Sequence, residues 1–312
     1  MTLAIVRPGP FTTVQDLGRP GHGGVGVPPS GAADSLALRI ANRLVGNPDR
    51  CAAIEFTLVG PAIRFESDAC AALAGSRFAA KLDGRGAPHL ESFRVRRGQV
   101  LDIGQTTEGA RGILAVNGGI DVPLVLGSRS TFVGGGFGGV EGRSLRSGDR
   151  LPLDSAPGAA GRRQVRRGAL PTYESEPVLR VVAGPQREVF GDGAWRTFLT
   201  ADYKVSTRSD RVGVRLEGPA LERNDAADLL PEGLAPGAIQ VPGDGQPILL
   251  GADRPTTGGY TKIATVVTVD LWRAAQAKPG DRMRFVEIGV EAARVLYRER
   301  QEWLRSVIED AA

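Results

Sequence analysis

Residues 240–270 alternate short extended runs with turn-forming glycines, a pattern typical of a chain built from many short strands. Residues 248–250 form a short apolar run, and residues 263–269 are rich in β-branched side chains. The turn formers at 243–245 and at 257–259 supply residues that adopt positive φ at low cost. The stretch is therefore expected to form three extended segments joined by two tight turns.

Polar side chains gather at the ends of these segments. They are Gln240, Gln246, Asp253, Arg254, Thr256, Thr257, Tyr260 and Lys262. A carboxylate, a lysine, amides and hydroxyls around flexible glycines fit a site for a small polar substrate. The same residues also fit a pair of solvated turns with ordinary polar caps. The spacing alone leaves both interpretations open.

The composition extends the mainly β prediction to the whole chain. The 312 residues include 43 glycines and 21 prolines but only 5% aromatic residues, as expected for many short strands joined by tight turns. The formal net charge is +4, and few aromatics lie among the scattered arginines, so a nucleic-acid surface is not indicated. No apolar run reaches membrane length and no signal peptide is apparent, so we expect no membrane association and a cytoplasmic location.

Cysteine and histidine are too few for a structural metal site. Cys51 and Cys70 are the two cysteines, and His22 and His89 are the two histidines. None of the usual zinc spacings can be built from them, so we expect no metal. Both cysteines are expected to be small buried residues rather than nucleophiles.

Two parts of the sequence resemble each other. A Gly-Asp turn precedes an apolar strand in residues 147–151 (SGDRL) and again in residues 279–283 (PGDRM). The repetition favours two related β-domains over one continuous sheet. We predict these domains at residues 1–155 and 178–312.

The segment between the predicted domains has a different composition. Residues 156–177 are rich in Ala, Gly, Pro and Arg and have no periodicity, which favours an interdomain linker. After Glu287 the apolar residues recur at helical spacing among Glu and Arg, so the second domain is expected to end in a helix.

Residues 30–46 predict a helix in the first domain. Ser30 is a suitable N-cap, and Asp34 in the first turn suits the helix dipole. Gly46 is expected to end the helix. An apolar stripe at helical spacing is formed by Ala37, Ile40, Ala41 and Leu44.

Three local patterns carry separate expectations. Glu55 lies in an otherwise apolar strand, so its carboxylate must face solvent or have a partner. The glycine-rich residues 134–139 lack the Lys-Ser/Thr of a phosphate loop and are expected to form an open, mobile loop. Residues 211–217 alternate strictly between apolar and other residues, so one face of that strand should be buried.

Several longer motifs together resemble a known family. They are residues 11–21 (FTTVQDLGRPG), 30–34 (SGAAD), 41–48 (ANRLVGNP), 127–131 (GSRST), 209–213 (SDRVG) and the stretch 240–262. The sequence is similar to the biotin-dependent carboxyltransferase, or allophanate hydrolase subunit 2, family, which includes KipA-like proteins and the C subunit of the bacterial 5-oxoprolinase. The resemblance runs from Val6 to Phe285.

The resemblance implies a fold and a reaction. The expected fold is two cyclophilin-like β-barrel domains with a few helices and a C-terminal helix. The implied reaction is the ATP-dependent hydrolysis of a small cyclic amide, 5-oxo-L-proline, to L-glutamate. The implied partners are the other two subunits of such an enzyme, one KipI-like and one of the lamB/YcsF type, and the chain alone is expected to be inactive.

Residue chemistry and the matched motifs together suggest a candidate site. The expected catalytic residues are Asp253 as a base or orienting carboxylate, with Lys262 and Arg211 as cations for developing negative charge. The expected substrate-binding residues are Ser30, Gly31, Asp34, Asn117, Arg129, Gln240, Gln246, Thr257, Gly258, Gly259 and Tyr260.

Two other functions stay open at this point. One is a KipA-like regulatory protein that binds a KipI-like kinase inhibitor. The other is the carboxyltransferase component of a urea carboxylase or allophanate hydrolase-type system. ATP is the expected cofactor of the complex. No biotin is expected on this chain, because the methionines are Met1 and Met283 and neither belongs to a Met-Lys-Met biotinylation motif.

Overall fold

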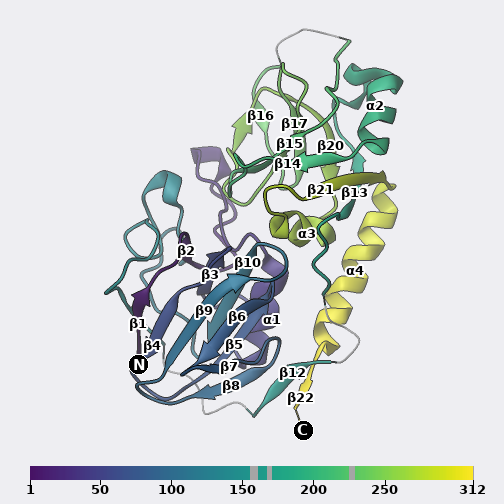
Figure 1. Ribbon diagram of the computed structural model, residues 1–312. Helices are drawn as coiled ribbons and strands as arrows, with labels where there is room; N and C mark the ends of the chain where they lie inside the picture. Colours follow the sequence, from purple (N-terminus) through teal and green to yellow (C-terminus); the bar gives the residue numbers. More distant parts are fainter. Residues whose placement is uncertain (155–160, 167–170, 225–228, 312) are drawn as a thin grey trace. The chain divides into compact units, whose positions relative to one another are not determined.

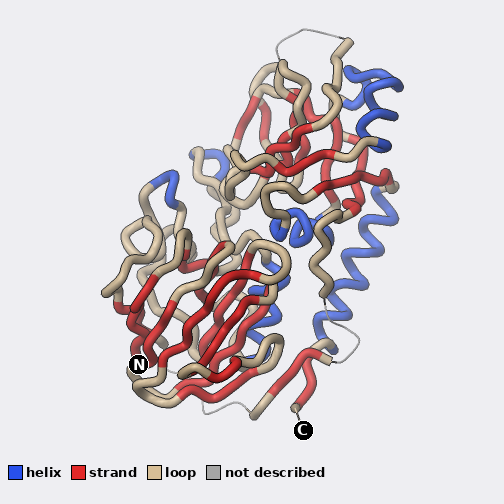
Figure 2. The backbone as a smooth tube through the Cα atoms, viewed as in Figure 1, coloured by secondary structure: helices blue, strands red, loops and turns tan. Residues whose placement is uncertain are grey.

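The computed structural model describes residues 1–154, 161–166, 171–224 and 229–311 (Figure 1). It divides into two compact units. The first contains residues 1–19, 30–172 and 303–312, and the second contains residues 20–29 and 173–302. Strands predominate in both units (Figure 2). The mainly β prediction is therefore confirmed.

The first unit contains two antiparallel sheets. The six-stranded sheet has the order β11 (Arg150–Pro152), β1 (Thr2–Arg7), β4 (Ala62–Phe65), β9 (Val100–Thr106), β6 (Phe78–Leu82), β7 (Arg85–Gly86). The five-stranded sheet has the order β2 (Thr12–Gln15), β3 (Ala53–Thr57), β10 (Arg111–Val116), β5 (Ala69–Gly75), β8 (Ser92–Val95). The 3-10 turn η2 (Val133–Gly135) lies in the long connection after β10.

Both sheets contribute to one core. Leu3 and Ile5 of β1 and Ile63 of β4 meet Ile54 of β3 and Leu114 of β10 in the same cluster. In β1 and β9 buried residues recur at every second position, because successive side chains of a strand point to opposite faces, whereas β2, β3, β5 and β10 are buried almost continuously and so are covered on both faces. The strands form two ladders that are linked at their margins, where Thr106 N of β9 donates to Leu58 O after β3 and Asp121 N donates to Pro152 O of β11.

The second unit contains a closed barrel. Its strand order is β13 (Val178–Ala183), β20 (Thr261–Val266), β17 (Ala238–Val241), β18 (Ile248–Leu250), β15 (Gly213–Glu217), β14 (Tyr203–Val205), β21 (Arg282–Glu287). A small pair, β16 (Glu232–Gly233) and β19 (Thr257–Gly258), lies beside it. The other elements of this unit are η1 (Gly23–Val25), η3 (Arg187–Phe190), α2 (Gly191–Thr200), η4 (Thr268–Asp270) and α3 (Leu271–Gln276).

The barrel is filled by apolar side chains that its strands turn inward. Val214 and Leu216 of β15 are buried while Arg215 and Glu217 are exposed, as the alternation predicts, but the prediction is wrong before β15, where Val212 is 42% exposed and Arg211 is buried in its ion pair with Asp253. Phe198 of α2 stacks on Phe285 of β21 with ring centroids 4.5 Å apart, so α2 closes one side of this core.

The structure confirms one of the two turns predicted in residues 240–270. β17 and β18 pair antiparallel, and Gly245 between them has φ +73°. The second predicted turn is wrong. β20 pairs with β17 and not with β18, and neither Gly258 nor Gly259 has positive φ. Because β17 lies between β18 and β20 in the barrel, the chain must cross the end of β17, which a two-residue turn cannot do.

Helix α1 (Ser35–Leu44) forms where the sequence predicts it, and its apolar stripe is buried. Its N-cap is Asp34 and not Ser30, because Asp34 Oδ1 accepts a hydrogen bond from Ala37 N at 2.8 Å. Ser30 lies outside the helix at φ +55°.

The repeated Gly-Asp turns are alike in detail. Asp149 Oδ2 accepts from Arg146 N at 2.7 Å, and Asp281 Oδ2 accepts from Lys278 N at 3.0 Å. The preceding glycines, Gly148 and Gly280, have φ +90° and +96°. Each turn leads into a strand, β11 or β21, so the two short sequences build the same local structure in different units.

The boundaries of the units differ from the predicted domains in two ways. The predicted linker, residues 156–177, contains β12 (Arg163–Val165), which pairs with β22 (Ile308–Asp310) in the first unit; residues 156–160 and 167–170 lie outside the described residues. The terminal helix is α4 (Val290–Ser306), and residues 303–312 belong to the first unit rather than the second. No helix in the described ranges combines the length and apolar character needed to span a bilayer.

His89 should make the stability of the first unit depend on pH. Burial lowers the pKa of His89, and its Nε2 lies 2.9 Å from the Gly75 carbonyl oxygen. The folded state therefore keeps the ring neutral, while the unfolded chain binds a proton below about pH 6.5. Stability should fall as pH drops from about 7.5 to about 5.5, by at most about 1.4 kcal/mol per pH unit. Denaturant midpoints across this range measure the slope. His89→Gln should flatten it, and an unchanged slope in that variant would contradict the assignment.

Candidate functional site

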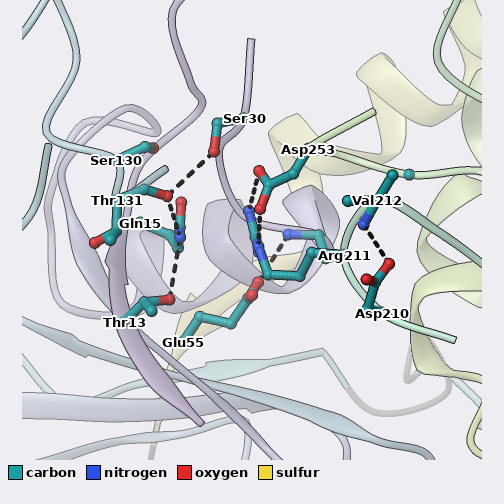
Figure 3. A network of polar contacts seen from close by, with 12 residues as sticks. Thr13, Gln15, Ser30, Glu55, Ser130, Thr131, Asp210, Arg211, Val212 and Asp253 are labelled. Atoms are coloured by element: carbon teal, nitrogen blue, oxygen red, sulfur yellow. Dashed lines mark hydrogen bonds and ion pairs between the residues drawn. The ribbon is translucent and has the colours of Figure 1, made fainter. Parts of the chain in front are cut away.

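Arg211 and Asp253 form a buried ion pair in the second unit. The guanidinium donates to the carboxylate twice, from Nε to Oδ2 at 2.7 Å and from Nη2 to Oδ1 at 3.0 Å (Figure 3). Their side chains are 6% and 8% exposed. Such a two-point contact fixes both groups in orientation as well as distance.

The barrel register brings this pair together. Arg211 precedes β15 and Asp253 follows β18, and the two strands pair antiparallel with Gly213 opposite Leu250. The backbone ladder continues past the strands, because Asp253 N donates to Arg211 O at 3.0 Å. Asp210 stabilises the turn that precedes β15, because its Oδ1 accepts a hydrogen bond from Val212 N at 2.8 Å (Figure 3).

Lys262 on β20 is another buried cation of this unit, in addition to Arg211 and Arg254. Its Nζ lies 2.6 Å from Glu232 Oε1 and donates to Tyr260 O at 3.1 Å. Gln186 joins them twice, by donating from Nε2 to Glu232 Oε1 and by accepting from Lys262 N at 3.0 Å. The hydrogen bonds from Lys262 and Gln186 hold the pKa of Glu232 below its usual value.

The two ion pairs differ in exposure. The Lys262 side chain is 4% exposed, whereas the Glu232 side chain is 42% exposed. Lys262 is therefore a buried cation whose counter-ion reaches solvent. A ligand anion could replace or join Glu232 at the Lys262 ammonium group. An anion could bind the Arg211 guanidinium in the same way only if the two hydrogen bonds to Asp253 were broken.

The predicted catalytic residues consequently fall into two groups. Arg211 contacts Asp253, while Lys262 contacts Glu232, a residue that the sequence did not single out. The pairing of Lys262 with Glu232 depends on β16, which pairs with β19. No sequence spacing signals it.

The predicted binding residues of the second unit have mixed surroundings. Gln240 is half-buried and lies opposite Lys262 in the β17–β20 ladder, and Tyr260 is half-exposed. Thr257 and Gly258 form β19 opposite Glu232 and Gly233, so they hold the acidic partner of Lys262 in place.

Two other predicted binding residues of this unit have backbone neighbours. Gln246 exchanges hydrogen bonds with the backbone of Gly218, from Gly218 N at 3.0 Å and to Gly218 O at 3.1 Å. A Cβ on Gly259 would lie 3.0 Å from the Leu229 carbonyl oxygen, so this position has little room for a side chain.

In the first unit the polar centre is Asp16, from the motif at residues 11–21. Its Oδ1 accepts from Ser128 Oγ at 2.6 Å, Ser130 Oγ at 2.5 Å and Gly18 N at 2.7 Å. Its Oδ2 accepts from Arg129 N at 2.6 Å. This buried carboxylate therefore ties residues 127–131 to the strand end at β2.

A second set of contacts adjoins this carboxylate. Gln15 Nε2 donates to Thr13 Oγ1 at 3.0 Å and to Thr131 O at 3.1 Å, and Ser30 Oγ donates to Thr131 O at 3.2 Å (Figure 3). A Cβ on Gly31, which has φ +90°, would lie 2.9 Å from Gly18 N, so only glycine fits there.

The remaining predicted residues of this unit have local partners. Arg129 donates to Val122 O at 2.9 Å and pairs with Asp121 at 2.7 Å. Asn117 Oδ1 accepts from Cys70 N at 2.7 Å. Asp34 caps α1.

The structure also adds residues that sequence reasoning missed. Asp16 and Arg19 lie within the motif at residues 11–21, but the sequence pattern did not indicate a role for either residue. Arg19 is buried, and its guanidinium lies 5.1 Å from the centre of the Phe137 ring. Glu55 does find a partner, because its Oε2 accepts from Ala33 N at 2.7 Å.

The glycine-rich residues 134–139 pack more closely on neighbouring backbone than expected. Phe132 and Phe137 form a β-bridge with T-shaped rings, and η2 lies between them. A Cβ on Gly138 would lie 2.0 Å from the Ser130 carbonyl oxygen. The expectation of an open loop is wrong here, because these glycines permit close backbone packing.

These features define a class: a mainly β protein of two units whose polar residues are anchored at strand ends. The chain belongs to the family described as the carboxyltransferase domain, subdomains A and B, whose model matches residues 25–287.

Individual relatives extend this result. The chain is 38% identical to the C subunit of 5-oxoprolinase from Escherichia coli, covering 98% of this chain and 97% of that protein. It is also 38% identical to urea amidolyase of Lachancea kluyveri, but spans only 18% of that protein. The fold of this chain is similar to part of the crystal structure of K. lactis urea amidolyase, with a TM-score of 0.94 and 33% sequence identity. The similar region covers 99% of this chain and 20% of the urea amidolyase chain.

Proposed function

We propose that this chain is the C subunit of an ATP-dependent 5-oxoprolinase, which hydrolyses 5-oxo-L-proline to L-glutamate together with its two other subunits. The observation that carries the proposal is the match to the C subunit of E. coli 5-oxoprolinase over nearly the full length of both proteins. The partners would be a KipI-like protein and a lamB/YcsF-type protein, and the complex would work in the cytoplasm.

The chemistry requires activation of a poor electrophile. A lactam carbonyl resists attack by water at neutral pH. Transfer of the terminal phosphoryl group of ATP to the amide oxygen would release ADP and activate the carbonyl carbon; attack by water there would break the C–N bond with a proton going to nitrogen, and hydrolysis of the resulting acyl phosphate would give phosphate and L-glutamate. Negative charge then develops at the oxygen, and a buried cation stabilises it most strongly where water is excluded. Lys262 has these properties, because it is buried and its counter-ion Glu232 is half-exposed.

The other predicted catalytic residues take a supporting part in this proposal. Asp253 is engaged twice by Arg211, so it serves to hold the guanidinium and the β15–β18 strand ends rather than to accept a proton. Gln186, which contacts both Glu232 and the Lys262 backbone, orients the lysine.

Turnover of ATP by reconstituted complexes tests the proposal. The chain with its partners should hydrolyse ATP when 5-oxoproline is added, and urea should not stimulate it. The chain alone should show no turnover. Stimulation by urea and not by 5-oxoproline would overturn the assignment, as would full activity without partners.

A second candidate function has its own support. The urea amidolyase relatives and the carboxyltransferase family model favour the carboxyltransferase component of a urea carboxylase-type system. In that case biotin on a separate carrier would supply the carboxyl group. This function predicts bicarbonate-dependent carboxylation of urea when a biotinylated carrier is supplied. The oxoprolinase assay above, run with and without such a carrier, separates the two.

Lys262→Met should abolish substrate-stimulated turnover of the complex while lowering stability by only about 1 kcal/mol, because Glu232 can be solvated once its partner is removed. Lys204→Met is the matched control, since Lys204 is an exposed lysine on β14 of the same barrel. Turnover and the denaturant midpoint should be measured on both variants. Retained turnover in Lys262→Met would remove this residue from the mechanism.

A further inference from the structure

Arg254, which follows β18 in the second unit, is a buried arginine that the proposed mechanism leaves without a role. It is 8% exposed. Its Nε donates to Leu234 O at 3.0 Å, and its Nη1 donates to Gly251 O at 3.4 Å. Asp253, its neighbour in sequence, contacts Arg211 instead. Within the described ranges the Arg254 guanidinium is therefore held by backbone oxygens.

The charge of Arg254 has no counter-ion among the described residues. Arg211 and Arg180 of the same unit each contact an aspartate, at 2.7 and 2.5 Å, whereas no ion pair in the described part of the chain includes Arg254. Burial lowers the pKa of Arg254, but a guanidinium still keeps its charge at neutral pH. A neutral amide could donate to the same two carbonyl oxygens without the cost of burying a charge, so the charge itself calls for an anion from outside the chain.

Arg254 has donors left for such an anion. An arginine has five N–H groups, and Arg254 uses two of them on Leu234 and Gly251. Nη2 has no hydrogen-bond partner among the described residues and does not belong to their enclosed, unpaired polar atoms, so solvent reaches it. The two backbone contacts fix the plane of the guanidinium, and the remaining N–H groups of Nη1 and Nη2 suit the two oxygens of a carboxylate.

Arg254 and Lys262 are held at opposite ends of one short segment. Lys262 contacts the side chain of Glu232, which begins β16. Arg254 contacts the carbonyl oxygen of Leu234, directly after β16 ends. Leu234 N donates to Thr256 O at 3.0 Å, so the β16–β19 ladder continues to this point. Two residues of a strand rise about 7 Å, so the two cations are attached to nearby points of the same segment.

We propose that Arg254 binds the carboxylate of the substrate and makes the site specific for lactams that carry one. This inference rests on the proposed 5-oxoprolinase function and assigns a residue to the recognition of its substrate. 5-Oxoproline has its carboxylate and its lactam oxygen on either side of the ring nitrogen, so Arg254 holds the carboxylate while Lys262 serves the oxygen. Urea carries no negative charge and leaves the buried guanidinium unpaired, which selects against it.

Steady-state kinetics of the reconstituted complex test the assignment with 5-oxoproline and with 2-pyrrolidinone, the same lactam without its carboxylate. Arg254→Gln keeps side-chain donors for the carbonyl oxygens but removes the charge. It should raise the KM for 5-oxoproline about 10- to 100-fold, as expected for the loss of a hydrogen bond to a charged group, and change kcat by less than about threefold. The inhibition constant of 2-pyrrolidinone as a competitor should not change, because this ligand has no carboxylate to lose.

Two further variants separate recognition from folding. Arg254→Lys keeps the charge but cannot make the planar two-point contact, so its KM for 5-oxoproline should lie between those of the wild type and Arg254→Gln. Arg215→Gln is the matched control, since Arg215 is an exposed arginine on β15 of the same barrel, and it should behave as the wild type. Denaturant midpoints show which variants keep the fold. If Arg254→Gln does not, Arg254→Lys decides, and its KM should still rise about threefold or more with unchanged inhibition by 2-pyrrolidinone.

The inference is overturned if the KM of Arg254→Gln for 5-oxoproline equals that of Arg215→Gln. It is also overturned if the Arg254 variants weaken 5-oxoproline and 2-pyrrolidinone to the same extent, as a purely structural residue would. Both outcomes leave the proposed function intact, because the wild-type complex still hydrolyses 5-oxoproline. A wild-type complex that 5-oxoproline does not stimulate would overturn the proposed function itself, and this inference with it.

Discussion

Asp253→Ala should lower the free energy of unfolding by about 3–5 kcal/mol, because it removes the buried carboxylate that accepts two hydrogen bonds from the Arg211 guanidinium. The cost arises from desolvation: the cation keeps its charge at any accessible pH, yet water reaches it poorly. Loss of activity in this variant would then follow from a damaged second unit rather than from a missing base. Denaturant midpoints and slopes of the wild type and the variant measure the effect.

Asp192→Ala is the matched control for this change. Asp192 also pairs with an arginine of the second unit, Arg187, at 2.6 Å, but its side chain is 83% exposed. Exposed pairs contribute little, so this control should change stability by less than about 1 kcal/mol. A double variant, Arg211→Met with Asp253→Leu, should recover part of the loss, because it replaces the buried guanidinium and its carboxylate together by apolar side chains. An unshifted midpoint in Asp253→Ala would show that the pair is not structural and would restore Asp253 as a candidate base.

Asp16→Asn should destabilise the first unit by about 2–4 kcal/mol although it is nearly isosteric. The native carboxylate accepts from two hydroxyls and two backbone N–H groups. An amide replaces one oxygen by an NH₂ group, so at least one buried donor would face another donor. The expected result is a lower denaturant midpoint with an unchanged slope, together with faster proteolysis near residues 127–131.

Asp121→Asn tests whether the geometry around Asp16 is responsible. Asp121 pairs with the side chain of Arg129, whose backbone N donates to Asp16, but its own side chain is 47% exposed. The same chemical change should therefore cost well under about 1 kcal/mol, as is usual for exposed ion pairs. Equal effects of the two substitutions would contradict a special role for Asp16.

The local structures could be predicted because their causes lie close together in the sequence. The apolar stripe of α1, the alternation in residues 214–217 and the Gly-Asp turns at 148–149 and 280–281 each depend on neighbouring residues. Helical and strand periodicity act within a few residues, so composition and spacing are sufficient for them. The sequence motifs also predicted the protein family, and the family model that matches residues 25–287 confirms this prediction.

The predictions that failed depend on strand order. A tight turn at 257–259 was expected because residues 248–250 and 263–269 follow each other in sequence, but β17 separates their strands in the barrel. The open loop at 134–139 was expected from glycine content, yet Gly138 packs on the backbone of Ser130.

The sequence by itself therefore determined the mainly β character, helix α1 and the terminal helix, and which residues are chemically able to form a site. Only the tertiary structure decided their partners. Asp253 meets Arg211 from 42 positions away, and Asp16 meets Ser130 from 114 positions away. Such contacts depend on the order and register in which strands pair. A shift of one residue in a strand moves each side chain to the opposite face, and local periodicity does not fix the choice of neighbouring strand.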